Sequence, residues 1–166
     1  MTNVIAAYPC LGKTTLYQLN KTFIFDREFN ESRSVIGMSN EQIQSFFKAC
    51  ADIVCLQILT GTYEILFITE DERLLSELNS RGIKPILIFP DAFDDAYMNQ
   101  YKEKVIQRSG LDWWNRVLAS EIPILTDRIK KYKELGYDVR LTNSANPYIE
   151  NVIDLPDYIS TFGVFN

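Results

Sequence analysis

Histidine is absent from the 166-residue sequence, and this absence narrows the chemistry open to the chain. Without an imidazole there is no Ser-His-Asp or Cys-His triad, no histidine-bearing zinc site and no histidine acid/base step. Any catalysis must therefore use carboxylates, lysine, arginine, hydroxyl groups or a bound metal.

Cysteine is scarce as well, and the spacing of the three cysteines matches neither a disulfide framework nor a metal site. No uninterrupted apolar run reaches the roughly 18 residues that a membrane-spanning helix needs. The N-terminal residues also lack the basic stretch, apolar core and cleavage site of a signal peptide. We therefore expect a cytoplasmic protein that does not have a membrane as its partner.

Basic residues are fewer than acidic ones: 17 Lys and Arg stand against 22 Asp and Glu, so the net charge is -5 at pH 7. This balance argues against nucleic acid as the main partner, because proteins that bind its backbone are usually basic. It leaves room for a local positive pocket that holds a small phosphate compound.

The length and the 46% hydrophobic content fit one globular domain over residues 1–166. The sequence does not indicate an oligomeric state.

Short apolar runs alternate with helical patterns along the chain. The expected strands are residues 4–7, 22–25, 63–68, 85–89 and 137–141. The spacing of apolar residues predicts helices over about 41–59, 92–108 and 112–135, the last with an allowed break at Pro123. Thr69 and Glu72 have the spacing of a capping box, which predicts a further helix with Thr69 as its N-cap.

This alternation predicts an α/β fold whose parallel sheet is covered by helices on both faces. Ligands of such sheets bind at the carboxyl ends of the strands. The residues that follow the expected strands therefore share one edge of the sheet, and they include the loop after residue 7, Asp26, Thr69, Glu70 and Asp91.

Gly12-Lys13-Thr14 lies between the first expected strand and a helix start, where a phosphate-binding loop would stand. Gly12 would let the backbone approach a phosphate, Lys13 would reach the outer phosphates and Thr14 could bind magnesium. Ala7 occupies the position that usually opens this pattern with glycine, which is tolerable where no positive φ is needed. The alternative is an ordinary strand-to-helix turn with a solvated lysine.

Four stretches carry a resemblance to a known family, and together they cover roughly the first two-thirds of the chain. They are VIAAYPCLGKTTL, FIFDREFNESRS, YEILFITEDERLLSELNSRGIKPILIFPD and YMNQYKEKVIQRSG. Through them the chain resembles the P-loop nucleotide kinases, and more narrowly the small nucleoside-monophosphate-kinase-like (adenylate-kinase-like) proteins of bacteriophages and Gram-positive bacteria. The resemblance implies a three-layer α/β/α P-loop NTPase fold with a five-stranded parallel sheet of order 2-3-1-4-5. It also implies an acceptor-binding segment at about 27–40 and a short helical lid at about 92–122.

The same resemblance implies a set of site residues. ATP would be bound by Pro9, Cys10, Leu11, Gly12, Lys13, Thr14 and Thr15, and Mg²⁺ by Thr14 and Asp26. The acceptor would be held by Arg27, Arg33 and Glu70, and the lid would carry Lys102, Lys104 and Arg108. The catalytic residues would be Lys13, Asp26 and Arg108. The chain departs from the family at Thr69-Glu70, where the third strand usually ends in aspartate, and at the two lysines of the lid.

Each of these roles has a plainer alternative. Asp26 could be a turn residue, Arg33 a solvated side chain, and the basic lid positions one polar helix face.

The function implied by the resemblance is an ATP- and Mg²⁺-dependent phosphotransferase, whose acceptor is a small phosphate-bearing compound such as a nucleoside or deoxynucleoside monophosphate. Alternatives are a nucleotide-binding protein with little turnover that acts through a partner, and a kinase for a polynucleotide end or a small-metabolite hydroxyl.

Overall fold

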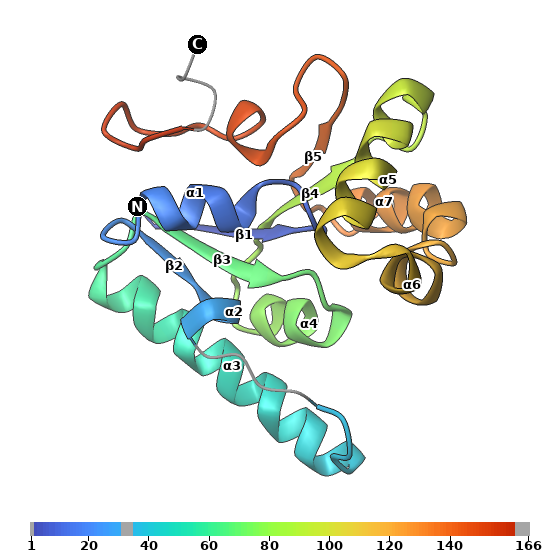
Figure 1. Cartoon of the computed structure of the whole chain (residues 1–166). Helices are drawn as coiled ribbons and strands as arrows, with labels where there is room; N and C mark the ends of the chain where they lie inside the picture. Colours follow the sequence, from blue (N-terminus) through green and yellow to red (C-terminus); the bar gives the residue numbers. More distant parts are fainter. Residues whose placement is uncertain (1, 31–34, 162–166) are drawn as a thin grey trace.

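A computed structural model describes residues 2–30 and 35–161 of the chain. Its centre is a parallel five-stranded sheet made of β1 (Asn3–Ala7), β2 (Ile24–Asp26), β3 (Ile65–Thr69), β4 (Ile86–Pro90) and β5 (Val139–Thr142). The strand order is β2-β3-β1-β4-β5 (Figure 1). The predicted α/β class, the parallel sheet and its strand order are confirmed.

Helices cover both faces of this sheet (Figure 1). The α-helices are α1 (Lys13–Leu19), α2 (Arg27–Asn30), α3 (Asn40–Thr60), α4 (Glu72–Ser80), α5 (Asp95–Ser109), α6 (Leu111–Trp113) and α7 (Leu125–Glu134). A π-helical turn (Trp114–Leu118) and two short 3-10 helices (Ile122–Ile124 and Ile149–Asn151) complete the described elements. In Figure 1, α1 lies on one face of the sheet, and α3 and α4 lie on the other.

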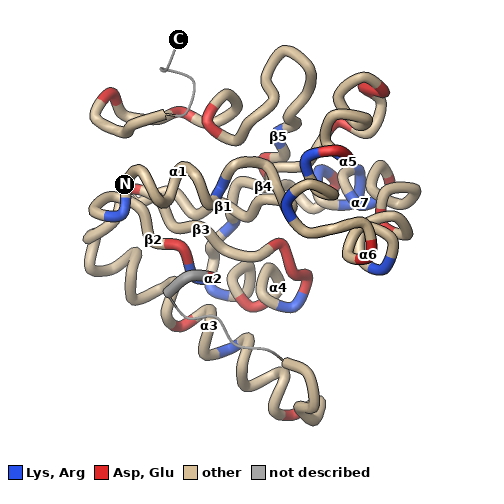
Figure 2. The backbone as a smooth tube through the Cα atoms, viewed as in Figure 1, with Lys and Arg blue, Asp and Glu red and all other residues tan. Residues whose placement is uncertain are grey.

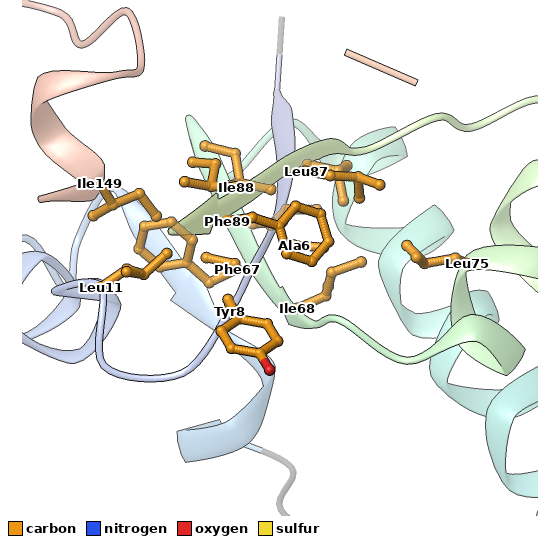
Figure 3. Close-up of a cluster of buried hydrophobic side chains, with 14 of the residues drawn as sticks. Ala6, Tyr8, Leu11, Phe67, Ile68, Leu75, Leu87, Ile88, Phe89 and Ile149 are labelled. Carbon is orange, nitrogen blue, oxygen red and sulfur yellow. The ribbon is translucent and has the colours of Figure 1, made fainter. Parts of the chain in front are cut away.

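The core is built on the three central strands, which are apolar almost throughout because both of their faces are covered. Ala6, Leu66 and Leu87 have no exposed surface. Figure 3 shows that Tyr8 and Leu11, from the loop after β1, lie among these buried side chains. The loop that follows the central strand is therefore anchored in the core.

The long helix α3 follows the prediction closely. Ser39 and Gln42 form a capping box at its start, and Gly61 ends it with a φ of 61°. By length and composition α3 could also span a membrane, although it holds no uninterrupted apolar run of that length, because isolated charges such as Lys48 and Asp52 interrupt its apolar residues without making the helix polar. A single helix of this kind does not by itself indicate a membrane protein.

One predicted helix boundary was wrong. Thr69 is the last residue of β3, paired in register with Ala7, and the N-cap of α4 is Asp71, whose carboxylate accepts the Arg73 N–H. The strand runs one residue further than expected, so the cap moves forward. The break allowed at Pro123 in the expected helix over 112–135 is confirmed, because Pro123, which has no N–H to donate, lies in a 3-10 turn before α7. The part before this break is divided further, into α6 and the π-helical turn.

Candidate functional site

The loop between β1 and α1 leaves the sheet at the carboxyl end of the central strand. The Tyr8 N–H still donates to the Ile88 carbonyl at 2.9 Å, so the turn begins only after Tyr8. Cys10 and Gly12 have positive φ values of 61° and 97°, and α1 begins directly afterwards. Ala7 remains a regular residue of β1. The alanine that replaces the usual first glycine therefore stands where no positive φ is required.

Neighbouring segments donate hydrogen bonds to two carbonyl groups of this loop. The Tyr101 hydroxyl donates to the Pro9 carbonyl at 2.9 Å, and the Ile149 N–H donates to the Leu11 carbonyl at 2.9 Å. In the described parts of the chain no acceptor is found for the first three N–H groups of α1, and Gly12 has no side chain to cap them. The carbonyl groups of Pro9 and Leu11 are therefore occupied while the first N–H groups of α1 stay open, which is an arrangement that favours an anion.

A cavity of about 300 Å³ opens over this loop. The loop and the first turn of α1 contribute Tyr8, Pro9, Cys10, Lys13 and Thr14 to its wall. The rest of the wall includes Glu28 from α2, Thr69 and Glu70 at the end of β3, Arg108 from α5 and Trp113 from α6. Segments more than a hundred residues apart in the sequence thus meet at one edge of the sheet. Leu11 points into the core instead, and Thr15 is exposed and is not among the described lining residues.

Two cations reach this cavity. The Lys13 ammonium, almost fully buried, lies 3.1 Å from the Glu28 carboxylate. The Arg108 guanidinium donates to the Thr14 hydroxyl at 3.3 Å and to the Cys10 sulfur at 3.6 Å. Figure 2 shows basic positions at the start of α1 and on the neighbouring α5. The structure therefore brings together Lys13 and Arg108, two of the three residues expected to be catalytic.

The third, Asp26, lies behind the wall and not on it. Its side chain has no exposed surface, and one carboxylate oxygen accepts the Glu28 N–H at 3.0 Å. The other oxygen has no partner within residues 2–30 and 35–161. Burial raises the pKa of this carboxyl, and the nearby Lys13 charge opposes the shift. The carboxylate after β2 that lines the cavity is that of Glu28, which no sequence pattern indicated.

Magnesium has few protein ligands available here. No group of three or more acidic, cysteine or histidine side chains suited to a metal occurs in the described part of the chain. Mg²⁺ at nucleotide sites keeps several waters and phosphate oxygens and needs only one or two protein ligands. Of the two expected ligands, the Thr14 hydroxyl lies on the cavity wall and fits that requirement. The second Asp26 oxygen has no hydrogen-bond partner among the described residues, but it is buried behind the wall.

The three expected acceptor residues have different positions. Arg27 is buried: its guanidinium donates to the Cys50 sulfur at 3.2 Å and to the Thr69 hydroxyl at 3.1 Å, and it is not among the described lining residues. Arg33 lies outside the described residues. Glu70 does line the cavity.

The Glu70 carboxylate is engaged by its neighbours. It accepts the Tyr132 hydroxyl at 2.8 Å and lies 3.4 Å from the Arg128 guanidinium. Burial raises the pKa of Glu70 to about 7, although the Tyr132 hydrogen bond and the Arg128 charge oppose the shift.

The lid positions are divided by the helical period of α5. Arg108 lies two turns after Tyr101, on the same face of the helix, and reaches the cavity. The Lys102 ammonium lies over the Trp114 ring, and the Lys104 ammonium lies 4.3 Å from the centre of the Tyr148 ring. Neither lysine is a described part of the cavity wall. Of the three, the structure brings only Arg108 to the site.

A second cavity, of about 460 Å³, adjoins the first across Tyr8, Pro9 and Glu70. Its other walls are formed by Asp71, Glu72, Arg73, Val117, Leu118, Glu121 and Arg128. Both arginines are paired with carboxylates, Arg73 with Asp71 at 2.7 Å and Arg128 with Glu121 at 2.8 Å. No local sequence pattern predicts this cavity, because its two sides lie far apart in the chain.

Comparisons of this chain with protein-family models, with curated proteins and with solved structures found no match. Its function is therefore inferred from the site itself.

Proposed function

We propose that the chain is an ATP- and Mg²⁺-dependent phosphotransferase of the P-loop type, which transfers the γ-phosphoryl group to a small acceptor. The observation that supports this most directly is the convergence of Lys13 and Arg108 on one cavity above the loop. Phosphoryl transfer asks mainly for positioned phosphates and positive charge, and these two side chains and the loop N–H groups would supply both.

On the donor side, the triphosphate would accept hydrogen bonds from the first N–H groups of α1 and from the Lys13 ammonium. Arg108 would exchange its contact with the Thr14 hydroxyl for one with the transferring phosphoryl group. The Thr14 hydroxyl would be the protein ligand of Mg²⁺, which neutralises phosphate charge when bound. The chain's own residues would contribute to catalysis by holding the triphosphate and the acceptor in the orientation that the transfer needs.

On the acceptor side, the second cavity provides the space next to the first. Two acceptor classes are compatible with the transfer. One is the phosphate-bearing compound implied by the resemblance, such as a nucleoside or deoxynucleoside monophosphate, and the other is a hydroxyl compound.

One observation favours a second candidate, a nucleotide-binding protein with little turnover. The residues at the end of β3 provide no free carboxylate, because Thr69 bears a hydroxyl and Glu70 is bonded to Tyr132 and Arg128. A protein of this kind would bind ATP and act through a partner.

The test compares ATP binding and ADP formation in two matched lysine variants. Lys13→Ala should weaken Mg²⁺-ATP binding by about tenfold or more, measured by calorimetry. Lys21→Ala, which removes the same charge from an exposed position, should not. ATP affinity that is unchanged in Lys13→Ala would overturn the phosphate-loop proposal. ATP binding without acceptor-dependent ADP formation would favour the binding protein.

A further inference from the structure

Glu28 is the carboxylate after β2 that reaches the cavity, and three contacts fix its position. One of its side-chain oxygens lies 3.1 Å from the Lys13 ammonium, and the other accepts the Thr69 hydroxyl at 3.3 Å. Its backbone N–H donates to Asp26. The Glu28 side chain is 44% exposed, whereas Asp26 has no exposed surface. A bound molecule could therefore touch Glu28 but not Asp26.

The position of Glu28 relative to Lys13 suggests a role. In the proposed function, the Lys13 ammonium contacts the outer phosphates of ATP. A carboxylate 3.1 Å from that ammonium would lie close to a γ-phosphoryl group held by Lys13, and Glu28 lines the cavity from which an acceptor would approach. A general base needs to lie within hydrogen-bond reach of the proton that it removes. Glu28 meets this requirement for an acceptor that attacks from the cavity.

The charges around the two cavities indicate which acceptor fits. Of the described cations that line them, Lys13, Arg73 and Arg128 are each paired with a carboxylate, and Arg108 is the one that is not. Arg27, expected to hold an acceptor phosphate, is bonded in the core. A phosphate monoester in the second cavity would therefore lie near carboxylates, and the two described cations there are already paired with carboxylates. A compound that donates hydrogen bonds from hydroxyl groups has no such conflict.

We propose that the acceptor is a small hydroxyl compound without a phosphate group, and that Glu28 takes the proton of the attacking hydroxyl. This inference rests on the proposed phosphotransferase function. The acceptor oxygen forms a bond to the γ-phosphorus as the bond from that phosphorus to the β,γ-bridging oxygen breaks. The electron pair of the broken bond leaves with ADP, and the hydroxyl proton passes to the Glu28 carboxylate.

The first experiment uses acceptor pairs that differ only in a phosphate group. Four deoxynucleosides and their 5′-monophosphates, together with glucose, inositol and ethanolamine, are each incubated with the protein, ATP and Mg²⁺, and ADP is measured. We expect ADP formation with at least one hydroxyl compound and about tenfold less with its phosphorylated partner, where the panel holds one. Turnover confined to the monophosphates, or no turnover with any compound while ATP binds, would overturn the hydroxyl assignment. Failure of ATP to bind would instead overturn the phosphotransferase proposal, so the two failures are distinguishable.

The second experiment does not depend on finding the natural acceptor, because water can replace it. Glu28→Gln should lower the rate of ATP hydrolysis by about 100-fold and leave ATP affinity nearly unchanged, since a positioned base contributes this much to the rate. Glu28→Asp, which keeps a carboxylate, should restore part of the rate, and Glu103→Gln, on an exposed face of α5, should have no effect. Circular dichroism would show that each variant is folded. Equal hydrolysis by the parent and folded Glu28→Gln would overturn the role of Glu28.

Discussion

The Lys13 ammonium and the Glu28 carboxylate lie 3.1 Å apart, and this ion pair joins the first turn of α1 to the segment after β2. Lys13 is almost fully buried, while Glu28 is nearly half exposed. The pair therefore sets the position of two charged groups on the cavity wall more than it stabilises the fold.

A double-mutant cycle should show this directly. We expect the coupling between Lys13→Met and Glu28→Gln in the free energy of unfolding to be about 1 kcal/mol or less, because solvent screens the exposed partner. Urea denaturation of the parent, the two single variants and the double variant gives the coupling. A value of several kcal/mol would mean that the pair is a major stabilising contact.

A side chain at Gly12 should destabilise the fold and disturb the loop. Its φ of 97° is strained for any L-residue, so Gly12→Ala should lower the free energy of unfolding by about 1–2 kcal/mol. Gly82→Ala is the matched control, because Gly82 also has a positive φ (75°) with open space around it. Both variants should lose stability in urea, but only Gly12→Ala should weaken ATP binding. Equal ATP affinity in the two variants would show that the loop geometry is not needed.

The hydrogen bond from the Tyr101 hydroxyl to the Pro9 carbonyl should hold the loop in shape. Tyr101→Phe leaves that carbonyl without its donor and should cost about 1–2 kcal/mol in the free energy of unfolding. It should also weaken ATP binding. Tyr137→Phe removes a similar bond to the Leu75 carbonyl, away from the loop, and should leave ATP affinity unchanged. The two affinities, measured by calorimetry, decide whether α5 supports the site.

Glu70 should give the protein a pH-dependent stability. Its folded-state pKa, raised by burial to about 7 from 4.5, means that the folded chain binds this proton more tightly than the unfolded chain. The free energy of unfolding should therefore fall as pH rises through this interval, by an amount on the order of 3 kcal/mol. Glu70→Gln cannot titrate and should lack this decrease. Urea denaturation at several pH values tests it, and equal pH slopes in parent and variant would contradict it.

Cys10 should report on occupation of the loop. Its side chain lines the cavity, whereas Cys50 is buried and Cys55 lies on α3 outside the described cavity walls. Bound ATP should slow alkylation of Cys10 by iodoacetamide and leave the rate at Cys55 unchanged, as measured by mass spectrometry of the peptides. Alkylation of Cys10 at the same rate with and without ATP would place the nucleotide elsewhere.

The parts of the fold that could be predicted from sequence are those with local patterns. Apolar runs located all five strands, and the tripeptide at Gly12 located the turn after β1. Helix boundaries were less predictable where two neighbouring residues could both serve as the N-cap. Thr69 and Asp71 are both good N-caps, and the register between β1 and β3 decides in favour of Asp71.

The rest of the site depends on contacts that the sequence does not display. The four-residue helix α2 has too few turns to show a period, so nothing in the sequence indicated that Arg27 enters the core while Glu28 faces the cavity. Glu70 meets Arg128 and Tyr132 across about sixty residues of chain. Such pairings follow from the packing of whole helices and not from any short motif.

The loop after β1 contains a single glycine, yet its shape is fixed by partners from α5 and from the segment at Ile149. A loop rich in glycine would lose much conformational entropy when a ligand orders it. In this chain the backbone of the loop loses its conformational entropy when the protein folds, so a bound phosphate would order little additional backbone. Substitutions in α5 or near residue 149 should therefore alter binding at the loop as much as substitutions within it.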